Sequence, residues 1–73
     1  MHTLAWQVLK LFSDMQRDEL DLHILFESAG NDPEGRVRVL NAIDDLLREG
    51  LLEIAGNDFY RITDKGKNAT APV

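Results

Sequence analysis

The chain has 73 residues, no cysteine, 44% hydrophobic residues and 13 acidic against eight basic side chains, for a net charge of −5. This length accommodates one domain, and the absence of cysteine excludes disulfides and cysteine-based zinc sites. The composition is too apolar and too regularly patterned for a disordered segment, and its charge is unfavourable for a partner that is itself acidic.

The distribution of charge divides the chain into two unlike halves. Residues 1–35 contain two basic and seven acidic side chains, whereas residues 36–73 contain six of each. The start of the chain lacks the basic region and apolar run of a signal peptide, and no apolar stretch reaches the ~20 residues that span a membrane. We therefore expect a cytoplasmic protein that does not enter a membrane.

The first predicted helix covers residues 3 to about 15. Its apolar residues recur every three or four positions, as on one face of a helix. The expected buried stripe consists of Leu4, Val8, Leu11, Phe12 and Met15, widened by Ala5 and Leu9. Trp6 lies well away from the centre of this stripe.

Two further helices are predicted after a polar connector that has a very short strand near Leu20. Asp21 is the expected N-cap of a helix over residues 22–29, which Gly30 ends. Asp32 and Pro33 then start a third helix that stops at Gly50. Its expected buried side consists of Val37, Leu40, Ile43, Leu46 and Leu47, with Val39 nearby.

After Gly50 the apolar period changes from that of a helix to that of a strand. Residues 51–54 and 59–62 alternate, and Gly56-Asn57-Asp58 between them is typical of a tight hairpin turn. Thr63-Asp64 looks like a helix cap, but Gly66 and the following residues favour a frayed end. The sequence thus predicts one domain over residues 1–67, with a flexible tail over residues 68–73. Its fold class is mainly α with a small β-hairpin, an α+β fold.

A family resemblance is carried by residues 43–67. This stretch contains Leu46-Leu47 and Glu49-Gly50 before the first strand, and the run Tyr60-Arg61-Ile62-Thr63-Asp64-Lys65-Gly66 after the turn. It resembles the recognition-helix end and wing of winged helix-turn-helix proteins, among them bacterial MarR-like and PadR-like regulators and small archaeal regulators. The resemblance implies three helices followed by a hairpin, and DNA binding in transcription regulation.

If the family role holds, the third helix enters the major groove of double-stranded DNA. Arg38 and Asn41 are side chains of the types that recognise guanine and adenine edges. The side chains expected at the phosphate backbone are Arg36, Arg48, Arg61, Lys65 and Lys67. Against this, the outer face of the helix has a net charge of −1, and the wing tip contains Asp58 where basic residues are common.

The alternative hypothesis is an acidic module for protein–protein interaction or dimerisation that does not bind DNA. Exposed tryptophan is often an anchor at interfaces. Trp6, with Leu9 beside it, is the candidate contact with a second copy of the chain or with a basic protein.

Catalytic and metal-binding patterns are not evident in the sequence. His23 and Glu27 are one helical turn apart, which indicates a surface pair and not a metal site without a third ligand. Neighbouring acids such as Asp44 and Asp45 point about 100° apart on a helix, so they do not form an acid–base pair. We expect no enzymatic activity, no cofactor and no bound metal.

Overall fold

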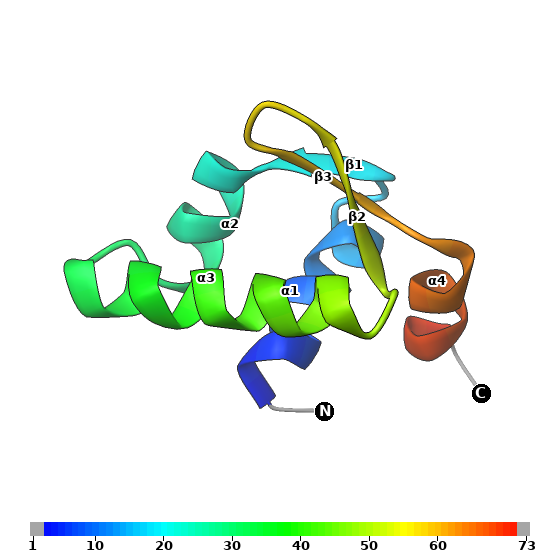
Figure 1. Cartoon of the computed structure of the whole chain (residues 1–73), viewed down its shortest axis with the longest axis horizontal. Coiled ribbons are helices and arrows are strands. Elements are labelled where there is room, and N and C mark those ends of the chain that lie inside the picture. Colours follow the sequence, from blue (N-terminus) through cyan, green and yellow to red (C-terminus); the bar gives the residue numbers. More distant parts are fainter. Residues whose placement is uncertain (1–2, 72–73) are drawn as a thin grey trace.

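The computed structural model describes residues 3–71 as four helices and a three-stranded antiparallel sheet (Figure 1). The elements in chain order are α1 (Thr3–Asp14), β1 (Glu19–Asp21), α2 (Leu22–Ala29), α3 (Pro33–Arg48), β2 (Leu52–Gly56), β3 (Phe59–Ile62) and α4 (Asp64–Thr70). The mixed α+β class is therefore confirmed.

The sheet has the order β1-β3-β2, so the last strand in the chain is the central one. Leu20 of β1 lies opposite Tyr60 of β3, and Glu53 of β2 lies opposite Arg61. Asp58, in the turn between β2 and β3, has a φ of 59°. Aspartate tolerates this left-handed conformation better than most residues. Both the hairpin and the short strand near Leu20 are confirmed.

The starts and ends of α2 and α3 follow the predicted capping pattern. The backbone N–H of Ile24 donates to the Asp21 carboxylate at 2.8 Å, so Asp21 caps α2 as expected. Asp32 occupies the N-cap position of α3 without a side-chain bond, and Pro33 follows as the first helical residue. Beyond α3, Gly50 has a φ of 74°, which favours glycine.

The predicted frayed end after Thr63 is wrong as far as Thr70, because residues 64–70 form α4. The Thr63 hydroxyl accepts from the backbone N–H of Gly66 at 3.1 Å and so caps the helix. Gly66 packs so closely on the Leu51 carbonyl and the Ile62 side chain that a Cβ there would collide with them. Glycine therefore allows α4 to dock here, an effect of tertiary packing that outweighs its poor helix propensity. Residues 72–73 of the predicted tail lie outside the described residues.

Within residues 3–71 the buried side chains are all apolar, and they form a core that lies between the helices and the inner face of the sheet. Its buried members are Ala5, Val8, Leu9, Phe12, Leu20, Leu25, Val39, Ala42, Ile43, Leu46, Leu51, Leu52 and Ile62. Leu9 is 0% exposed. Its predicted role in a partner-binding surface is therefore wrong, because Leu9 packs in the core beside Val8 and Phe12.

The predicted buried faces of α1 and α3 need three further corrections. Met15, Val37 and Leu40 were expected inside, but all three side chains are exposed. Met15 lies beyond the last residue of α1. On α3, the buried face is the one that carries Gly35 and Ala42, and the absence of a Cβ at Gly35 allows Gly30 to approach closely.

The contact between Gly30 and Gly35 yields a stability prediction for the turn between α2 and α3. A Cβ at Gly35 would lie 2.9 Å from the Gly30 Cα, and backbone does not move aside cheaply. We expect Gly35→Ala to lower the free energy of unfolding by about 1–3 kcal/mol in urea denaturation. Asn41→Ala, at an exposed position of the same helix, is the control. It should change the free energy of unfolding by under about 0.5 kcal/mol. Equal effects of the two substitutions would contradict this account.

Candidate binding surface on α3 and the hairpin

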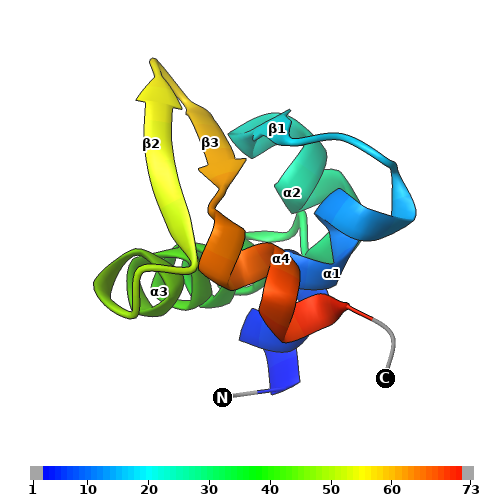
Figure 2. The ribbon, with the colours of Figure 1, turned by 90° about the vertical axis from the view of Figure 1, so that its right-hand side faces the viewer.

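Helix α3 lies along one edge of the molecule, with the β2–β3 hairpin rising from its C-terminal end (Figure 2). Arg38 and Asn41, the predicted base-reading residues, are both exposed and line one depression of about 250 Å³. Asp45 lines the same depression. The Arg38 guanidinium lies 3.9 Å from the Glu34 carboxylate, one helical turn away. The fold thus brings the two predicted residues together, but among carboxylates.

Arg48, near the end of α3, is paired with two acids. Its Nε lies 3.3 Å from an oxygen of Asp44, and its Nη2 donates to Asp45. All three side chains are substantially exposed, so these pairs are individually weak. Two carboxylates around one guanidinium nevertheless leave this end of the helix negative.

Arg61 lies at the centre of an ion-pair ladder across the outer face of the sheet. Its Nη2 lies 2.9 Å from Glu19 of β1, and its Nη1 lies 3.2 Å from Glu53 of β2. Hydrogen bonds to Glu19 and then to Glu53 raise the pKa of Arg61 above its usual value. The predicted phosphate contact of Arg61 would have to displace two carboxylates.

Arg36 is turned back onto the segment between α2 and α3. Its Nε and Nη2 donate to the side-chain oxygen of Asn31 at 3.1 and 3.0 Å. Its guanidinium lies 5.6 Å from the centre of the Phe26 ring, a cation–π distance.

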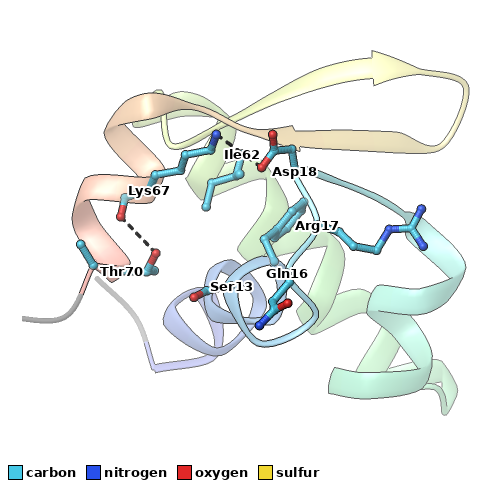
Figure 3. Close-up of a pocket in the computed structure, with 9 residues that line it drawn as sticks. Ser13, Gln16, Arg17, Asp18, Ile62, Lys67 and Thr70 are labelled. Atoms are coloured by element: carbon cyan, nitrogen blue, oxygen red, sulfur yellow. Dashed lines mark hydrogen bonds and ion pairs between the residues drawn. The ribbon is translucent and has the colours of Figure 1, made fainter.

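The two predicted lysines belong to α4 and are held locally. The Lys65 ammonium donates to the backbone oxygen of Glu49 at 2.8 Å. Lys67 lies 3.3 Å from Asp18 across a pocket of about 400 Å³ between α1, the segment that follows it and α4 (Figure 3). Phe12 and Ile62 line this pocket together with Ser13, Gln16 and Thr70. Lys67 therefore joins α4 to the segment before β1.

The exposed apolar side chains of α3 and the hairpin are what sequence analysis missed. Val37 and Leu40 of α3 are 58% and 44% exposed, and Ile54 and Phe59 of the hairpin are 69% and 43% exposed. We call Val37, Leu40 and Ile54 the α3–hairpin surface. Phe59 is two residues from Arg61 on β3 and therefore lies on the outer face of the sheet, opposite to Ile54. The signal for them is the surplus of apolar residues on α3, since one buried face of a helix cannot hold them all.

Ile54 owes its exposure to the geometry of the hairpin. Side chains alternate across a strand, so Leu52 and Ile54 share one face of β2. Leu52 lies opposite Ile62 and both are buried, whereas Ile54 lies two residues further toward the turn, opposite Tyr60. The hairpin thus extends beyond the core and presents an uncovered isoleucine.

Trp6 of α1 is 38% exposed and lies outside the buried stripe, as its position on the helix indicated. Met15, just after α1, and Phe59, on the outer face of the sheet, are the other large apolar side chains exposed outside the α3–hairpin surface among residues 3–71. His23 Nε2 lies 2.9 Å from Glu27, both exposed, in the surface pair that their spacing indicated.

The described part of the chain contains neither a candidate metal-ion site nor a candidate membrane-spanning helix. Within residues 3–71, no three or more His, Asp and Glu side chains are grouped so as to hold a metal ion. None of the helices in this range combines the length and the apolar character that crossing a bilayer requires.

Comparisons with protein-family models, curated protein sequences and solved structures find no match for this chain.

The ion-pair ladder on the sheet predicts a salt-dependent loss of stability when Arg61 is replaced. Arg61→Gln leaves Glu19 and Glu53 flanking β3 without their shared cation, so we expect a lower Tm than that of the unmodified chain. The decrease should be larger at about 20 mM than at about 500 mM salt, because salt screens exposed charges. Arg17→Gln is the control, as Arg17 makes no ion pair within residues 3–71. A decrease in Tm that does not depend on salt would contradict the electrostatic explanation.

Proposed function

We propose that the chain is a winged-helix module that binds a protein partner through the α3–hairpin surface. The winged-helix interpretation is supported by the order of elements, in which α2 and α3 are separated by three residues and followed by a hairpin. A short connection between two crossing helices is typical of helix-turn-helix proteins, and the hairpin takes the place of the wing (Figure 1).

The observation that carries the proposal is the exposure of Val37, Leu40 and Ile54 on the two elements that winged-helix proteins use for recognition. Each Å² of apolar surface withdrawn from water contributes about 25 cal/mol. Apolar side chains gathered on two adjoining elements therefore favour a partner with apolar side chains of its own. A phosphate backbone offers none.

The charges of the same region favour a protein over DNA. Residues 33–62 contain six acidic and four basic side chains, for a net charge of −2. Among the basic ones, Arg38, Arg48 and Arg61 lie within 4 Å of carboxylates. DNA binding gains much of its free energy from the release of counterions by cations that are available to phosphates. Here each such contact would set a phosphate beside a carboxylate.

Photo-crosslinking in the cells that naturally produce the chain tests this proposal. A photoreactive amino acid in place of Val37 should give a discrete adduct with another protein, because Val37 is the most exposed large apolar side chain of α3. The same amino acid in place of Asn68, exposed on α4, is the matched control and should not give this adduct. The adduct should disappear when Leu40→Ser and Ile54→Ser are added. No adduct from position 37, or the same adduct from both positions, would refute the proposal.

A second candidate function is double-stranded DNA binding, favoured by the exposure of Arg38 and Asn41 side by side on α3. These two residue types recognise guanine and adenine in the major groove. To bind DNA in this way, the Arg38 guanidinium must leave the Glu34 carboxylate and form hydrogen bonds with the edge of a base.

Fluorescence anisotropy of labelled duplex DNA separates the two candidates. Under our proposal, random-sequence duplex should show no binding at about 20 mM salt, where exposed charges are least screened. Binding that weakens steeply with salt and is lost in Arg38→Glu, but kept in Arg17→Glu, would establish the DNA-binding alternative instead.

A further inference from the structure

We infer that the partner presents a cationic amphipathic helix to the α3–hairpin surface, with its positive charges beside the C-terminal half of α3. This inference rests on the proposed function and specifies the chemistry of the partner. It is drawn from the shape of the exposed apolar stripe and from the uneven charge along α3.

The apolar stripe of α3 has the form that another helix packs against. Val37 and Leu40 are three residues apart and therefore neighbours on one face of a 16-residue helix about 24 Å long. The helix lies along an edge of the molecule with no other element covering its outward side (Figure 2). Rows of side chains at this spacing are the ridges that a second helix receives in its grooves. Ile54, on the adjoining strand β2, adds a side contact.

Charge is distributed unevenly along the same helix. Residues 33–40 contain one acidic and two basic side chains, whereas residues 41–49 contain three acidic and one basic. The one basic side chain there, Arg48, is shared by Asp44 and Asp45. The C-terminal end of a helix also has a partial negative charge, which adds to the effect. A partner helix that lies along α3 is therefore favoured when its cations face this end.

The Glu49 carboxylate adds a further negative charge to this end of α3. Lys65 donates to the backbone oxygen of Glu49, and no basic side chain in the described part of the chain forms an ion pair with its carboxylate. Glu49, Asp45 and Arg48 line a depression of about 270 Å³ next to α1. This depression faces α1, on the side of α3 away from Leu40, so Asp44, one helical turn after Leu40, is the acid beside the apolar stripe.

The charge of the chain also argues against a second copy as the occupant of this surface. Each copy has a net charge of −5, so two copies repel one another as they approach. A cationic partner is attracted by the same field, which raises its rate of association.

Designed peptide helices of about 18 residues test the inference on the full chain, with leucine on one face and lysine confined to one end. The matched control peptide has glutamate in place of every lysine. Titration of the isotope-labelled protein, followed by its backbone amide NMR signals, gives both the affinity and the location of binding. We expect the lysine peptide to shift signals of α3 and the hairpin, and to bind at least about tenfold more tightly than the glutamate peptide.

Paired variants test the role of the acids. Asp44→Asn with Asp45→Asn should weaken binding of the lysine peptide about fivefold, since two exposed charge contacts are lost. Asp14→Asn with Glu27→Gln removes the same number of exposed acids from α1 and α2 and should leave the affinity nearly unchanged. A spin label at the lysine end of the peptide should broaden the signals of residues 44–49 more than those of residues 33–38.

Four results of the experiments on the purified protein would overturn the inference. These are equal binding of both peptides, equal weakening by both variant pairs, shifts centred on α1 and α4, or self-association of the protein that Val37→Ser abolishes. A crosslink from position 37 to a protein without a basic helix would overturn the inference and leave the proposed function standing. Absence of any such crosslink would refute the proposed function itself, so the two failures are distinguishable.

Discussion

The packing of α1 on one face of α3 is the interaction on which the rest of the structure depends. With no disulfide and no buried polar side chain among residues 3–71, the fold is held by an apolar cluster that includes Leu9 and Phe12 of α1 and Leu46 of α3. A domain of this size has little stability to spare, so this contact decides which residues of α3 are buried. By the same step it decides that Val37 and Leu40 face outward.

The hairpin depends on the same core and extends beyond it. Leu52 and Ile62 anchor its base, and Gly66 allows α4 to close against that base. Beyond the base, the inner face of the hairpin has no helix to cover it, so Ile54 stays exposed. One rigid scaffold thus presents two apolar contributions, from α3 and from the hairpin, at fixed positions. Such preorganisation lowers the entropic cost of binding a partner.

This surface differs from a typical nucleic-acid interface because its arginines form ion pairs with nearby carboxylates. A net charge says little about where cations are available, but the structure places carboxylates beside Arg38, Arg48 and Arg61. Each pair is weak because it is exposed to water. Together they still reduce the positive potential that a phosphate backbone requires, and they leave an apolar surface bordered by acids.

The sequence by itself determined the mixed α+β class, the extents of three helices, the Asp21 cap and the hairpin turn, because these depend on local spacing and on residues with restricted backbone preferences. Only the tertiary structure decided that Leu9 is core, that Val37 and Leu40 are exposed, and that residues 64–70 form a helix. The physical reason is that the apolar arc of α3 is wider than the face that the neighbouring elements cover, so its own period does not say where burial ends. Selection came from the shape of α1, and the docking of α4 came from a close approach to Leu51 and Ile62 that only glycine permits.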